Sequence, residues 1–180
     1  MNGFIKNPAF TGILWLIARI FVGYEFINAG WEKITSGEWV GGDAISGFLQ
    51  GAIAKSTGAH PEVQDWYVWL VNHVFLPNAT LFSTLVALGE VSVGIALILG
   101  LFTKFAALMG AIMNFVFLAA GTSSVSPQMI VLEVAMVFAG AGVAFYAVDH
   151  FLMPNIARLF HVKAEEKPIA QTGSLPVPIR

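Results

Sequence analysis

The chain has 180 residues, of which 57% are hydrophobic and 11% are charged. An ordinary soluble domain carries about 25% charged residues, so this composition excludes a water-soluble surface and indicates an integral membrane protein. The net charge of -2 and the lack of a basic cluster exclude electrostatic nucleic-acid binding, and the absence of cysteine excludes disulfides, iron–sulfur ligation and thiolate chemistry.

Four apolar segments are long enough to cross a bilayer as helices, which takes roughly 20 residues each. They cover residues 11–33, 77–100, 103–121 and 127–148. The first is too long for the apolar core of a signal peptide and is predicted to be a retained span. We therefore predict an all-α fold, a polytopic integral membrane four-helix bundle that forms one domain over residues 1–160.

The loop over residues 34–76 is expected to contain short amphipathic helices. Apolar residues recur at helical spacing from Ile45 to Ile53, and Pro61 is suited to open a second helix. Five aromatic residues in or beside this loop are interpreted either as a belt at the level of the lipid headgroups or as a lid over a ligand. They are Trp31, Trp39, Trp66, Tyr67 and Trp69.

Basic residues predict the orientation of the chain. With four spans, one side of the membrane collects Lys6, Lys104, Arg158, Lys163, Lys167 and Arg180. The other side has only Lys33 and Lys55. The positive-inside rule then places both termini in the cytoplasm and residues 34–76 outside the cytoplasmic membrane. The proline-containing tail over residues 161–180 is expected to be a flexible cytoplasmic extension.

Ionisable residues within the spans are the candidate site, because an intramembrane charge costs at least about 2.5–3.5 kcal/mol. They are Arg19, Glu25, Glu90 and Glu133. The helical rise predicts that Arg19 and Glu90 lie at one depth with Asn114, and that Glu25 and Glu133 form a second layer.

Two interpretations stay open for Arg19 and Glu90: a buried ion pair that joins two helices, or the frame of a binding pocket. Glu25 and Glu133 have no evident cation at their depth and would repel each other when both are ionised, which favours a role in proton transfer. No span has a histidine near its middle to bind haem, and no flavin, nucleotide or metal motif is present.

Several of these residues lie in stretches that resemble the DoxX family. The stretches are NAGWEK at residues 28–33, LGEVSVG at 88–94 and LGLFTK at 99–104, together with Arg19, Gly23 and Asn114. The similarity covers most of residues 14–148. The long aromatic outer loop favours the DoxD branch of the family, the large membrane subunit of thiosulfate:quinone oxidoreductase.

The resemblance implies an enzyme subunit that oxidises thiosulfate to tetrathionate and passes the electrons to a membrane quinone, with a small DoxA-like partner subunit. On this hypothesis Arg19 and Glu90 set the pocket, and Glu25 and Glu133 carry protons. The residues expected to bind substrate are Lys33, Asn114 and Trp31. The alternatives are a non-catalytic scaffold or accessory subunit of a redox or transport complex and, if the chain forms a homo-oligomer, a small-solute carrier.

Overall fold

The computed structural model describes residues 8–37, 39, 41–150 and 152. Their regular secondary structure is entirely helical, which confirms the predicted all-α class. The tail over residues 161–180, for which a flexible extension was predicted, lies outside the described residues.

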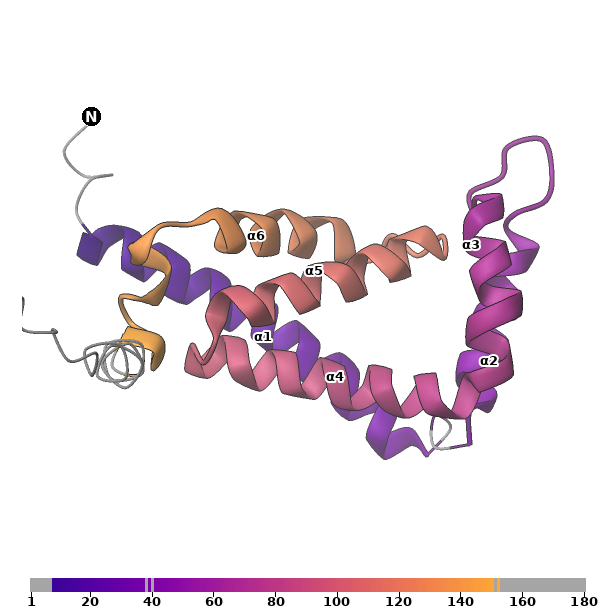
Figure 1. Cartoon of the computed structure of the whole chain (residues 1–180), viewed down its shortest axis with the longest axis horizontal. Helices are drawn as coiled ribbons and strands as arrows, with labels where there is room; N and C mark the ends of the chain where they lie inside the picture. Colours follow the sequence, from indigo (N-terminus) through magenta and orange to yellow (C-terminus); the bar gives the residue numbers. More distant parts are fainter. Residues whose placement is uncertain (1–7, 38, 40, 151, 153–180) are drawn as a thin grey trace, which may run out of the picture.

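Four helices run along a common direction and pack against one another (Figure 1). They are α1 (Pro8–Ser36), α4 (Ala79–Leu99), α5 (Thr103–Ala119) and α6 (Ser126–Phe138). The closest pairs are α1 with α4 and α5 with α6, and α4 joins the two pairs through its contact with α5. The turn between α4 and α5 has three residues, and such a short link favours the antiparallel packing of neighbouring helices that is seen here.

Shorter elements stand across one end of these helices (Figure 1). They are α2 (Asp43–Ala54), α3 (Asp65–Leu70), the π-helical turn η1 (Val71–Phe75) and the 3-10 turn η2 (Leu76–Asn78). Although Asp65–Leu99 is one helical run, it changes direction where η2 meets α4. Pro77 lies in η2, and proline disrupts a helix because it lacks an N–H and its ring clashes with the preceding turn.

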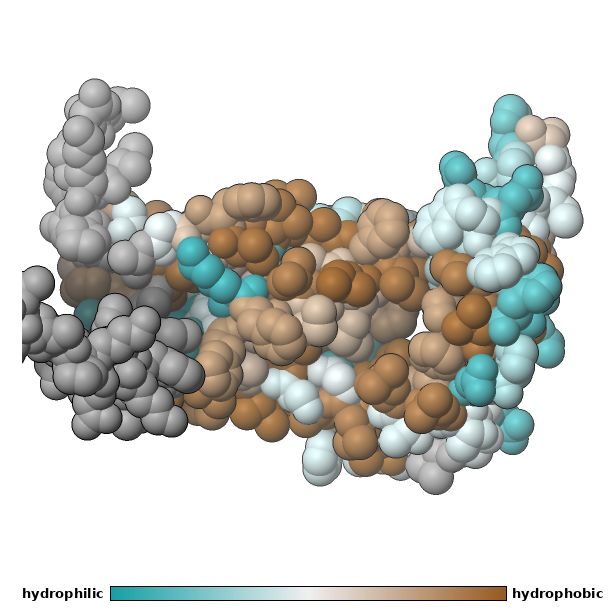
Figure 2. Space-filling model, viewed as in Figure 1, coloured by the Kyte–Doolittle hydropathy of each residue, from teal (hydrophilic) through white to brown (hydrophobic). Residues whose placement is uncertain are grey.

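Two helical runs, α1 and Asp65–Leu99, are each long and apolar enough to cross a membrane. The 17 residues of α5 and the 13 of α6 are also apolar, but they rise only about 26 Å and 20 Å, compared with about 30 Å of hydrocarbon. Large apolar side chains are exposed along the helices, such as Leu81 at 64% and Val131 at 68%. Hydrophobic residues cover the visible face of the helices, whereas hydrophilic residues gather around α2 and α3 (Figure 2).

The predicted continuous helix over residues 127–148 is wrong. Helix α6 ends at Phe138, the backbone is extended at Ala139 and Gly140, and a 3-10 turn, η3 (Ala141–Ala144), follows. Two glycines within three residues weaken the helix, since glycine loses the most backbone entropy on ordering. The turn packs against α1, where Gly142 lies beside Thr11.

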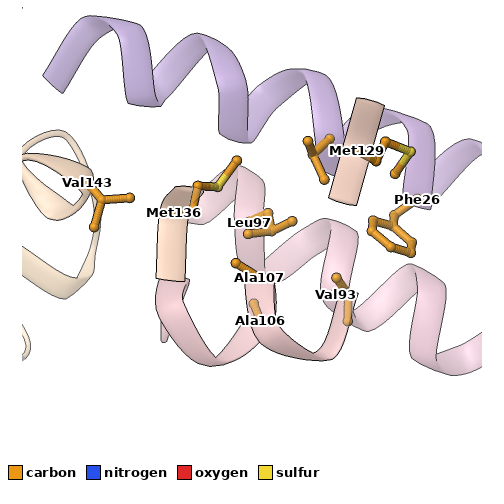
Figure 3. Close-up of a cluster of buried hydrophobic side chains, with 9 residues drawn as sticks. Phe26, Val93, Leu97, Ala106, Ala107, Met129, Met136 and Val143 are labelled. Atoms are coloured by element: carbon orange, nitrogen blue, oxygen red, sulfur yellow. The ribbon is translucent and has the colours of Figure 1, made fainter. Parts of the chain in front are cut away.

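Apolar side chains from α1, α4, α5 and α6 meet in one core cluster, including Phe26, Leu97, Met129 and Met136 (Figure 3). A second cluster joins α2, α3 and η1 to the near ends of α4 and α5, and contains Leu49, Val63, Tyr67 and Val71. Burial of these residues holds the predicted outer loop against the bundle, so the loop is part of the folded domain.

Candidate functional site

A cavity of about 380 Å³ lies at the end of the bundle nearest α2. Its walls come from α1, α4, α5, the segment that opens α6, the loop before α2 and α2 itself. This cavity is called the polar pocket below. Its polar lining residues include Glu25, Asn28, Glu32, Lys33, Glu90 and Asn114. Aromatic walls are supplied by Phe26, Trp39, Phe48 and Phe117.

Lys33 and Glu90 form an ion pair across the wall of the polar pocket. Lys33 Nζ lies 2.9 Å and 2.8 Å from the two carboxylate oxygens of Glu90. The Glu90 side chain is 2% exposed and that of Lys33 is 16% exposed. The ammonium also lies 5.0 Å from the ring centroid of Trp39 and 5.8 Å from that of Phe117. The cation is therefore held by a carboxylate and two aromatic rings.

Glycine residues bring α1 close enough to α4 for this ion pair to form. A Cβ at Gly94 would lie 2.6 Å from the carbonyl oxygen of Gly23, so the two backbones touch there. Seven residues further along α1, a Cβ at Gly30 would lie 2.9 Å from the carbonyl oxygen of Ala87 and 3.0 Å from Glu90 Cβ. Lys33 is one helical turn beyond Gly30, and its long side chain reaches back beside Gly30 to the Glu90 carboxylate.

A second buried carboxylate, Glu133, is held by Asn114. Asn114 Nδ2 donates to the Glu133 oxygens at 3.0 Å and 3.2 Å, and the Glu133 side chain is fully buried. Gly110 provides space for the carboxylate, because a Cβ at this position would lie 2.6 Å from Glu133 Oε1. Asn114 lines the polar pocket and thus connects it to Glu133, which stands behind the wall.

Arg19 does not lie beside Glu90, so the predicted ion pair between them is wrong and Arg19 does not line the polar pocket. Its Nη2 donates to the carbonyl oxygen of Tyr146 at 2.7 Å, and its Nη1 packs against Gly100 at the far end of α4. The predicted common depth of Arg19 and Glu90 assumed that the cytoplasmic ends of the spans are level with one another. With Gly23 opposite Gly94, Arg19 instead faces the end of α4, about 16 Å along α1 from the level of Gly30.

Of two further residues that were predicted for the site, one lines the polar pocket and the other does not. Glu25 is half-buried in the wall of the polar pocket, whereas Trp31 points away from it and is 60% exposed. The neighbouring Trp39 takes the place expected for Trp31. Because Trp39 and Phe48 line the cavity while Trp66 and Trp69 are exposed, part of the aromatic segment covers the pocket and another part faces outward.

Asp149 is a buried charge that sequence reasoning missed. Its two oxygens accept N–H groups of Phe102 and Thr103, each at 2.7 Å, at the start of α5. Helix α5 begins without a capping side chain of its own, since Phe102 occupies that position with a φ of 48°. The missing Ser, Asp or Asn before Thr103 was a signal that another segment must supply the cap.

No group of three His, Cys, Asp or Glu residues within the described part of the chain is arranged to hold a metal ion. The chemistry available in the polar pocket is that of a cation, ionisable carboxylates and an amide, enclosed by aromatic rings. Such a site can orient a neutral polar ring by hydrogen bonds and exchange protons with it.

An all-helical chain with an apolar exterior and buried charges around a polar cavity belongs to the class of integral membrane proteins. A sequence model of the DoxX family matches residues 14–121, and the chain belongs to this family. No curated protein and no solved structure matches it. The matched region includes Lys33, Glu90 and Asn114, whereas Glu133 lies beyond it.

Proposed function

We propose that this protein is the membrane subunit of a quinone-linked oxidoreductase and that the polar pocket binds the quinone ring. The observation that supports this best is the combination, in one cavity, of aromatic walls with the Lys33–Glu90 pair, Glu25 and Asn114. A quinone ring is flat and neutral, and its two carbonyl oxygens accept hydrogen bonds. These properties match the lining.

Each residue of the pocket has a role in this proposal. Reduction of a quinone adds two electrons to the ring and one proton to each carbonyl oxygen. Lys33 would donate a hydrogen bond to one oxygen and stabilise the negative charge that develops on it. Glu25, half-buried in the wall, would deliver protons. Asn114 would orient the ring, and Glu133 would hold Asn114 in place.

The electron donor is proposed to react outside the polar pocket, on a small DoxA-like partner subunit. Thiosulfate carries two negative charges, and oxidation of two thiosulfate ions to tetrathionate releases the two electrons that the quinone needs. In the pocket such an anion would meet Glu25, Glu32 and Glu90, while Lys33 is already paired with Glu90. Arg19, which was expected to set the pocket with Glu90, is buried and does not line this cavity.

The proposal includes a topology. We propose that α1, α4, α5 and the broken α6 segment all cross the cytoplasmic membrane as a four-helix bundle, with both termini in the cytoplasm. The polar pocket then opens toward the outer surface beneath α2 and Trp39. Exposed Asn28 and Glu32 lie at the pocket wall and would connect it to water for proton uptake.

The direct test is to measure, by isothermal titration calorimetry, the binding of a tail-less quinone to the purified protein in lipid nanodiscs. Saturable binding is expected, with a clear loss in Asn114→Leu and Lys33→Met and none in Glu62→Gln, an exposed residue outside the pocket. In the complex with its partner, thiosulfate-dependent quinone reduction should fall in the same two variants. Equal binding by all four proteins would refute the site.

A structural role is the second candidate function, because both buried carboxylates of the site already have partners within the bundle. Glu90 is paired with Lys33 and Glu133 with Asn114. On this alternative the protein is a non-catalytic scaffold of a redox or transport complex. Calorimetry would then detect no quinone, and the pocket variants would change thermal stability and co-purification of the partner instead.

A further inference from the structure

A groove of about 470 Å³ lies between α4 and α5 and is lined almost entirely by apolar side chains. The two helices diverge from their shared turn toward the end that α2 and α3 cover (Figure 1). Its lining includes Phe82, Val86, Gly89, Met109, Met113 and Phe117. Exposed Leu85, Phe105 and Ile112 are also lining residues, so the groove is on the exterior apolar surface of the bundle.

The groove adjoins the polar pocket. Phe117 lines both cavities and is the lining residue that they share. A third, small cavity of about 50 Å³ spans the same position and is lined by Trp39 and Phe48 of the polar pocket as well as Phe82 and Val86 of the groove. Their shared lining residues place the three cavities next to one another, in a path that runs from charged lining residues to apolar ones.

We propose that the α4–α5 groove binds the isoprenoid tail of a quinone whose ring occupies the polar pocket, with Phe117 at the junction between ring and tail. This inference rests on the proposed function. The path has one polar end and one apolar end, which matches an amphiphile with a small polar head and a single long apolar chain of linked isoprene units.

Charge argues for a neutral head over a phospholipid. A phosphate group at the polar end would face Glu25, Glu32 and Glu90, and Lys33, the one cation among the described lining residues, is bound to both oxygens of Glu90. A quinone ring carries no charge and avoids this repulsion. The charges of the polar pocket therefore favour a lipid with a neutral head over anionic and zwitterionic phospholipids.

Gly89 offers a way to fill the groove without disturbing the helix. A Cβ there would meet only Met113 Cε and Sδ, at 3.5 Å and 3.6 Å, which are ordinary contacts with the end of a flexible side chain. A leucine at this position would extend into the groove. Gly51 provides a matched control, because it is exposed on α2 and a Cβ there would have no neighbour within 4 Å.

The experiment uses a quinone whose tail carries a photoreactive diazirine, added to the full chain in nanodiscs of a single phospholipid. After illumination, mass spectrometry locates the labelled residues. Label is expected on Val86, Met109 or Met113, with most of it lost when excess unlabelled tailed quinone is present. Gly89→Leu should lose this label and weaken binding of tailed quinone more than of tail-less quinone, whereas Gly51→Leu should retain it.

Three outcomes would overturn the inference. Label spread over outward residues such as Leu81 and Val131, without competition, means that the tail stays in the bilayer. A diazirine phospholipid that labels the groove and is not displaced by quinone means that an ordinary lipid occupies it. In both cases binding of tail-less quinone in calorimetry leaves the proposed function standing. If the tail-less quinone does not bind, the proposed function and this inference are both refuted.

Discussion

Lys33 on α1 and Glu90 on α4 form a bidentate ion pair, with Nζ 2.9 Å and 2.8 Å from the two carboxylate oxygens. The two side chains meet beside Gly30, where α1 lies close to Ala87 and Glu90 of α4. It joins the two helices that pack most extensively in the bundle, and it places a cation and a carboxylate at the wall of the polar pocket. Its energetics can be tested directly.

Replacement of Glu90 by alanine should destabilise the protein more than replacement of both partners. The single change leaves the Lys33 ammonium without its counter-ion, which costs about 3–5 kcal/mol for a fully buried pair. The lower end is expected here, because Lys33 is 16% exposed and can reach water. Reversible unfolding in mixed micelles should show that Lys33→Met combined with Glu90→Leu recovers most of the loss. Glu32→Ala, at an exposed position, serves as the control.

Removal of the Asn114 amide should cost more stability than neutralisation of Glu133. Asn114→Ala leaves a fully buried carboxylate without its donor, a loss of about 1–3 kcal/mol. Glu133→Gln retains an oxygen that accepts from Asn114. Thermal melting of the two variants beside Leu108→Ala, which faces outward on the same helix as Asn114, provides the comparison. The opposite order would mean that the carboxylate, not the amide, stabilises this contact.

Two glycines on α4 should respond in opposite ways to the same substitution. A Cβ at Gly94 would lie 2.6 Å from the carbonyl oxygen of Gly23, so Gly94→Ala must push α1 away and lower the melting temperature. At Gly89 a Cβ makes only ordinary contacts with Met113, and Gly89→Ala should leave the melting temperature equal or slightly raised, because alanine is the better helix former. Equal melting temperatures would show that the helices do not touch at Gly94.

Loss of the Asp149 carboxylate should fray the start of α5. The carboxylate accepts two N–H groups and carries negative charge at a helix N-terminus, so Asp149→Ala is expected to cost about 0.5–2 kcal/mol. Hydrogen exchange at Phe102 and Thr103 should accelerate in this variant. Lys104→Gln changes an exposed charge in the same turn and should leave exchange unaltered. Unchanged protection in Asp149→Ala would contradict the capping role.

Partnerships between the helices were harder to predict from the sequence than the helices themselves. The residues Glu90, Asn114 and Glu133 were identified as unusual because polar groups stand out within apolar segments. Their partners were not identified, since counting residues gives the depth of a side chain only if the cytoplasmic ends of the spans are level with one another. Helix α1, with 29 residues, is longer than α4, with 21, so Arg19 faces the end of α4 and Lys33 pairs with Glu90.

The sequence by itself determined that this is an all-helical membrane protein of the DoxX family, because hydropathy and short motifs are local properties that can be recognised without knowing how the helices pack. The tertiary structure decided which charges meet. Contact between Gly23 and Gly94 sets the register of α1 against α4, and burial of the second cluster, which joins α2, α3 and η1 to α4 and α5, brings Trp39 and Phe48 over the cavity. Both depend on residues far apart in the chain, whereas the break after Phe138 follows from the nearby glycines Gly140 and Gly142 and is followed by packing of η3 on α1.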